Sequence, residues 1–258
     1  MSSTTFSLLH AFLFSLSFGS QLYTPVVKTK LTGAGFFKLI TSISLTSLIL
    51  SFGLRVVVSG QLSLIESMLH IGLIGSLIFA YIFHRDDRSL GMWILYVAQM
   101  LGFICLSFQL YPSSSDFLPL FFSSMMLLGI ANYSMLLGHY YLVVPKLSEQ
   151  PLIYCLYIFW AILIFKCLNS LSVIIFQGSP FLTEGSSLGD GYLYNWIFIS
   201  MRYLWGMLAP LILSFFTFRL CQLRSIQSAT GVLYIIEFFI IVGELISLYI
   251  KFNYGLSL

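Results

Sequence analysis

Eight long runs of apolar residues follow one another along the chain, separated by short breaks rich in charged residues, Pro, Gly and Ser. A helix needs about 20 mostly apolar residues to cross the hydrocarbon core of a bilayer. The predicted membrane-spanning helices are 5–23, 36–59, 62–84, 89–111, 117–143, 151–176, 194–218 and 228–250. We therefore expect an all-α, polytopic integral membrane helix bundle that forms a single domain over residues 1–258.

The composition supports a lipid environment for most residues. Of the 258 residues, 59% are hydrophobic and 8% are charged, whereas about 25% of a soluble domain is charged. The net charge of +3 is too small for a basic surface that binds polyanions, so no nucleic-acid partner is expected. The four cysteines show no Cys-x-x-Cys spacing, and no nucleotide-binding or hydrolase motif is present. Whether the protein is an enzyme is left open.

Positive charge is confined to alternate loops between the predicted spans. One set of loops and their flanks contains Lys28, Lys30, Arg85, Arg88, Lys146, Arg219 and Arg224. The other set contains no Lys or Arg and carries Asp116, Glu184 and Asp190. Because cytoplasmic loops are enriched in Lys and Arg, both termini are predicted to be extracytoplasmic, in a bacterial inner membrane or an equivalent one.

Several ionisable residues lie inside the predicted spans, where each is a candidate for function because charge in hydrocarbon is costly. Helix geometry places most of them at overlapping depths in the outer half of the bilayer, with Glu237 deeper. The candidate proton or ion pathway consists of Glu66, Lys166, Arg202, Glu237 and Glu244. Arg202 is expected to pair with Glu244 or Glu66, since a guanidinium in lipid cannot lose its proton. The alternative is that these groups are only structural ion pairs between helices.

The four histidines form a second pattern. His70 and His84 are 14 residues apart, so they leave the same face of one helix about 21 Å apart. This spacing resembles the one by which cytochromes b attach two haems to one transmembrane helix. It predicts two b-type haems, bound by His10 with His70 and by His84 with His139. The partners here lie on two different helices, unlike the cytochrome b pattern, and simple interfacial or interhelical histidines are the alternative.

Three functions remain in competition. The first is a diheme electron-transfer protein, or a subunit of one, that exchanges electrons with a quinone while intramembrane carboxylates move protons. The second is a proton-coupled transporter or channel that uses the intramembrane Glu, Arg and Lys residues and needs no cofactor. The third is a non-catalytic subunit of a larger membrane complex. In all three the lipid bilayer surrounds the protein. The second and third hypotheses differ from the first because they require no haem.

Overall fold

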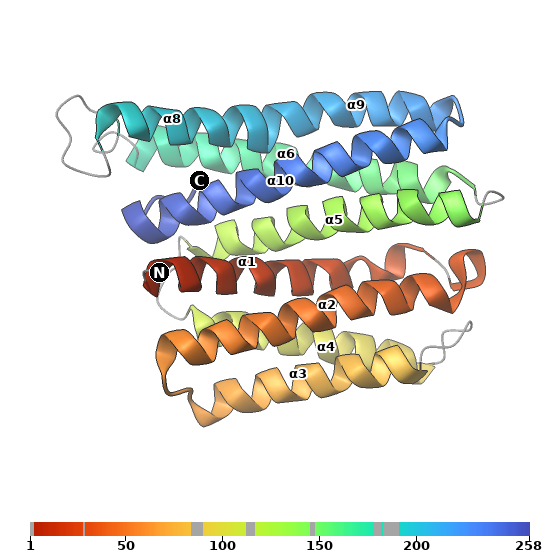
Figure 1. Ribbon diagram of the computed structural model, residues 1–258, viewed down its shortest axis with the longest axis horizontal. Coiled ribbons are helices and arrows are strands. Elements are labelled where there is room, and N and C mark those ends of the chain that lie inside the picture. The colour runs from red at the N-terminus through yellow and green to blue at the C-terminus, as the bar shows by residue number, and fades with distance from the viewer. Residues whose placement is uncertain are drawn as a thin grey trace.

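The computed structural model describes residues 3–27, 29–83, 90–111, 117–144, 148–177, 182 and 191–258. Within these residues the chain is a bundle of long helices that run back and forth side by side (Figure 1). In order they are α1 (Ser3–Leu22), α2 (Thr29–Ser59), α3 (Leu64–Phe83), α4 (Leu90–Leu110), α5 (Phe117–Val143), α6 (Gln150–Gln177), the composite helix α8–η2–α9 (Tyr192–Gln222) and α10 (Ile226–Tyr254). A short 3-10 turn, η1 (Thr24–Val26), follows α1.

Seven of these helices are long and apolar enough to cross a membrane, so the protein is an integral, multi-pass membrane protein. Their ends lie within four residues of the predicted ones, except that α2 begins seven residues early. The early part of α2 contains Gly33, whose φ of 74° interrupts the helix. Both termini lie at the same end of the bundle (Figure 1). Which side of the membrane that end faces stays a prediction.

The first helix, α1, is not among these seven, and several of its polar side chains face the interior of the bundle. Ser17 and Ser44 of α2 join the two helices through their hydroxyls, 3.1 Å apart. Ser20 accepts a hydrogen bond from Asn132 of α5 at 2.8 Å. Helix interfaces in membranes favour such small polar residues, since they allow close approach and hydrogen bonds across helices. The sequence predicted the length of α1, but it did not predict that α1 lies in the interior of the bundle.

Helices α1 and α5 form the centre of the bundle, with α2, α3 and α4 on one side and α6, α8, α9 and α10 on the other (Figure 1). In α5, 83% of the apolar window is buried inside the protein, against 50% or less in the other spans. Gly19 of α1 and Gly129 of α5 face each other so closely that a Cβ on either would overlap the other's backbone. Close contact between α1 and α5 at these two glycines therefore fixes how the two central helices pack.

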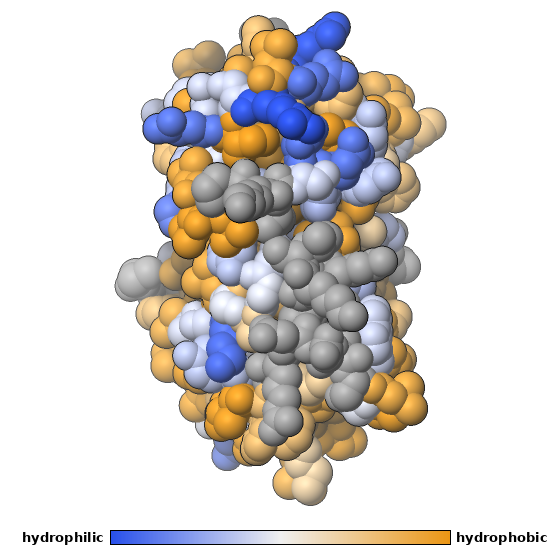
Figure 2. Space-filling model, turned by 90° about the vertical axis from the view of Figure 1, so that its right-hand side faces the viewer, coloured by the Kyte–Doolittle hydropathy of each residue, from blue (hydrophilic) through white to orange (hydrophobic). Residues whose placement is uncertain are grey.

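The end of the bundle where α9 meets α10 carries polar side chains. Figure 2 looks onto this end and shows hydrophilic residues gathered at its top, over the α9–α10 turn. Arg224 of that turn binds Glu149, which precedes α6, with 3.2 Å between Nε and Oε1. Several of the basic residues used for the orientation, Arg85, Arg88 and Lys146 among them, lie outside the described residues.

Candidate functional site

Three fully buried charged side chains meet between α6, α8 and α10. The carboxylate of Glu244 accepts from Lys166 Nζ at 2.5 Å through Oε2 and from Arg202 NH1 at 3.2 Å through Oε1. The three residues each lie about 15 Å along the helix axis from the same end of the bundle, which is why side chains distant in sequence can meet. All three side chains are 0% exposed. We call Lys166, Arg202 and Glu244 the charged triad.

The charged triad is not balanced in charge. Two cations share one carboxylate, so its formal charge is +1 when all three residues are ionised. Lys166 also donates to Ser124 Oγ of α5 at 2.5 Å. Arg202 Nε and NH2 have no hydrogen-bond partner among the described residues, although both atoms are buried. Buried polar groups are normally paired, so these two N–H groups are available to a further acceptor.

A break in the seventh span positions Arg202. Residues Leu204–Leu208 form a π-helical turn, η2, in which Ala209 N donates to Leu204 O. Pro210, two residues after Leu208, has no N–H with which to continue the α-helical pattern, so the wider turn has a local cause. The sequence showed Pro210 in mid-span but gave no sign of the π-helix.

Two glycines allow this turn to pack closely against α10. Gly206 of η2 and Gly243 of α10 are in direct backbone contact, and a Cβ on Gly206 would lie 2.9 Å from Arg202 NH1. The guanidinium therefore lies over the point where the two helices touch. Since Gly243 directly precedes Glu244, the same close approach brings the carboxylate to Arg202.

The segment Leu256–Leu258 folds back near the triad, at the end of the bundle that carries both termini (Figure 1). The chain reverses at Gly255, with φ of 79°, and Leu256 and Leu258 pack against Ile199 and Ile250. Ser247 of α10 donates to the carbonyl of Leu258. Ile199 lies one turn from Arg202, and Ser247 one turn from Glu244, so the segment packs about one helical turn from the triad.

Glu237 lies two turns from Glu244 on the same buried face of α10. Its side chain is in the bundle interior, and Oε2 has no partner among the described residues. Burying a carboxylate oxygen without a partner is costly. The two glutamates therefore differ: Glu244 is ion-paired, whereas Glu237 has no ion pair among the described residues.

A second polar cluster lies at the same end of the bundle, on α1, α2 and α3. Arg55 Nε donates to Glu66 Oε1 at 2.7 Å. The ring nitrogen Nδ1 of His70 is 2.9 Å from the carbonyl of Glu66. His10 lines a cavity of about 70 Å³ together with Arg55. This cluster is separate from the charged triad. The ionisable residues that helix depth grouped together therefore form two clusters.

The structure thus places each predicted pathway residue. Arg202 pairs with Glu244, and Glu66 pairs with Arg55, which lies four residues from the end of α2. Sequence analysis did not predict Ser124 as a neighbour of Lys166. A serine inside a span is too common a feature to single out, and only the packing of α5 against α6 gives it a role.

The histidines lie in two places. His10 and His70 are both buried, and Nε2 of each has no partner among the described residues. The ring of Phe52 lies 4.8 Å from that of His70, and Phe14 stacks on His10 at 6.4 Å. His139 forms a hydrogen bond of 3.0 Å with Tyr234 of α10, and His84 lies outside the described residues. In the described part of the chain, no three His, Cys, Asp or Glu residues are placed to hold a metal ion.

Comparison of the chain with models of protein families, with curated proteins and with solved structures finds no match.

Proposed function

We propose that the protein is a proton-coupled carrier of a small anion, with the charged triad as its binding site. The observation that carries this proposal is the excess of positive charge in the triad, together with two buried guanidinium nitrogens of Arg202, Nε and NH2, that have no partner among the described residues. A buried charge without a counter-charge is strongly unfavourable, so Glu244 acts as an internal counter-ion. An external anion and the Glu244 carboxylate compete for the same two cations.

This competition links the anion to a proton. When Glu244 takes up a proton, Lys166 and Arg202 lose their counter-ion, and an incoming anion restores the balance. When the anion leaves, the proton leaves Glu244 and the carboxylate returns to the cations. Glu237, two turns away on the same face, is a second carboxyl for the proton path. The segment Leu256–Leu258 packs about one helical turn from the site.

The test is proton uptake by the purified protein in lipid vesicles that contain a pH-sensitive dye. An inward pH gradient is applied in the presence of chloride, nitrate, acetate or a longer carboxylate, with the membrane potential clamped. We expect at least one anion to increase proton uptake, and Glu244→Gln to remove the increase. Glu66→Gln is the matched control, because it removes a carboxylate paired at 2.7 Å outside the triad. Uptake that none of the four anions stimulates, or that Glu244→Gln leaves unchanged, would contradict the proposal.

The diheme hypothesis is the second candidate, favoured by the free Nε2 atoms of two buried histidines, His10 and His70. As the side chains are arranged, Phe14 and Phe52 pack on these imidazoles, and the cavity beside His10 has a volume of about 70 Å³. A macrocycle between them would require these rings to move, so the residues do not fit a haem as they stand. A reduced-minus-oxidised absorption spectrum of the purified protein tests this function directly.

A further inference from the structure

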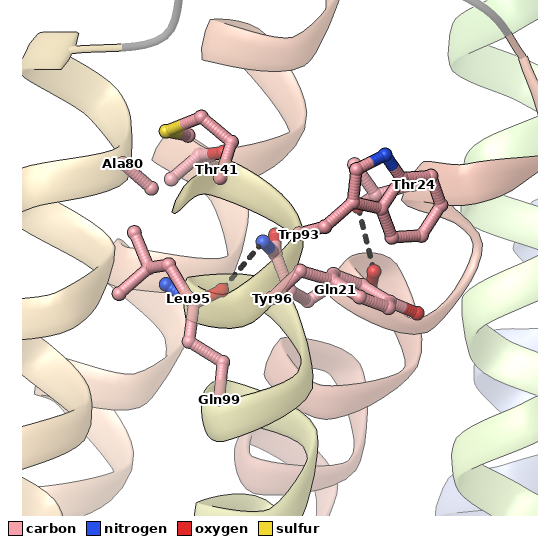
Figure 3. A pocket seen from close by; sticks show the side chains of 9 residues that line it. Gln21, Thr24, Thr41, Ala80, Trp93, Leu95, Tyr96 and Gln99 are labelled. Atoms are coloured by element: carbon pink, nitrogen blue, oxygen red, sulfur yellow. Dashed lines mark hydrogen bonds between the residues drawn. The ribbon is translucent and has the colours of Figure 1, made fainter. Parts of the chain in front are cut away.

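A small polar cavity lies near the opposite end of the bundle, between α1, η1, α2, α3 and α4. Its volume is about 30 Å³. Figure 3 shows Gln21 of α1 and Gln99 of α4 reaching toward each other across it, with Thr41 of α2 and Ala80 of α3 nearby. The cavity is distant from both ionisable clusters along α1, since His10 lies near the other end of that helix.

The two glutamines make only one of the two hydrogen bonds that a facing pair of amides can form. Gln21 Nε2 donates to Gln99 Oε1 at 3.0 Å. Gln21 Oε1 and Gln99 Nε2 have no partner among the described residues, although the side chains are only 3% and 2% exposed. One strong acceptor and one strong donor are therefore left unpaired beside the same cavity.

Two of the hydroxyl groups around the cavity, those of Thr24 and Tyr96, already have backbone partners. Thr24 Oγ1 donates to the carbonyl of Gln21 at 2.6 Å, and Tyr96 OH donates to the carbonyl of Leu22 at 2.8 Å. The remaining wall includes Ala80, Trp93 and Leu95. Among the residues that the structure describes, no cationic or acidic side chain lines the cavity, so this part of the chain offers a charged ligand no counter-charge.

We propose that this cavity binds one or two water molecules that bridge Gln99 Nε2 to Gln21 Oε1. A water molecule needs roughly 10–15 Å³ of such volume and two to four polar partners, so the available space and the two amide atoms suit it. The water accepts from Gln99 and donates to Gln21, which completes the bonding of both amides. The bridging water links α4, and through it α3, to the end of α1 that the loop charges predict to be cytoplasmic.

X-ray footprinting of the protein in lipid nanodiscs tests the site, because radiolysis of a bound water oxidises the side chains beside it. Met92 and Tyr96 line the cavity and are the reporters. Met100, which lies on the same helix and is also partly exposed but packs against apolar residues away from the cavity, is the matched control residue. We expect Met92 and Tyr96 to be oxidised severalfold faster than Met100 in the wild-type protein, even though lipid surrounds the bundle.

The variant Gln21→Leu with Gln99→Leu removes both amides and is expected to lower oxidation of Met92 to the rate of Met100. The comparison within the wild-type protein stands even if this variant does not fold. Equal oxidation of Met92 and Met100 in the wild type would overturn the proposal. So would a high-resolution map in which the two amides form both reciprocal hydrogen bonds with no density between them.

Discussion

Removing the carboxylate of Glu244 should destabilise the protein more than removing either of its cationic partners. Glu244→Gln leaves Lys166 and Arg202 facing each other with a formal charge of +2 in a site that is 0% exposed. Lys166→Met leaves a neutral pair of Arg202 and Glu244. Breaking a buried ion pair by removing one partner costs about 3–5 kcal/mol. At roughly 1.4 kcal/mol per tenfold change, Glu244→Gln should shift the unfolding equilibrium between about 10² and several times 10³.

The measurement is reversible unfolding in mixed micelles by added SDS, followed through the fluorescence of the four tryptophans. Glu66→Gln is the control with the same chemical change. Its partner Arg55 is 29% exposed and can turn toward the polar surface, so the expected loss is about 1 kcal/mol or less. The double variant Glu244→Gln with Lys166→Met should recover part of the loss, since one unpaired cation replaces two.

Equal losses of stability in the Glu244→Gln and Lys166→Met variants would refute this reasoning. If Glu244→Gln and Lys166→Met destabilise by the same amount, the carboxylate does not act as the common counter-ion. If the double variant shows simple additivity, Lys166 and Glu244 do not interact, since contacting charges couple in such a cycle. Either outcome would also weaken the proposed carrier function.

Three further predictions concern other parts of the molecule. Gly206→Ala should lower the melting temperature clearly more than Gly72→Ala, because a Cβ on Gly206 meets the α10 backbone and the Arg202 guanidinium, whereas nothing lies within 4 Å of one on Gly72. The pKa of the Glu149 carboxyl is held below its ordinary value by a hydrogen bond from the backbone N–H of Glu149 and by Arg224. The ionised carboxyl therefore stabilises the protein above the ordinary glutamate pKa, and this stabilisation is lost as pH falls through the lowered pKa. The difference in stability between the wild type and Glu149→Gln should therefore disappear at acidic pH. An impermeant thiol reagent should modify Ser148→Cys only after cells are permeabilised, since this loop is predicted to be cytoplasmic; labelling in intact cells would reverse the assigned orientation.

The amino-acid sequence alone located the long helices, of which seven are long and apolar enough to cross a membrane. The thickness of the hydrocarbon core sets the length of a spanning helix, so the apolar runs could be located without knowledge of their neighbours. The ends of α5, for example, are those predicted, Phe117 and Val143. Depth along each helix also follows from residue counting, and it correctly placed Lys166, Arg202 and Glu244 at one level.

Only the tertiary structure decided which charges meet. Glu66 and Glu244 were both allowed partners of Arg202 by depth, and the choice depended on how each helix is rotated and which helices are adjacent. That rotation is fixed by contacts such as Gly206 with Gly243 and Gly19 with Gly129, where packing of distant segments selects one arrangement. The hydropathy of a helix specifies that it crosses the membrane, but its neighbours specify the direction in which each side chain points.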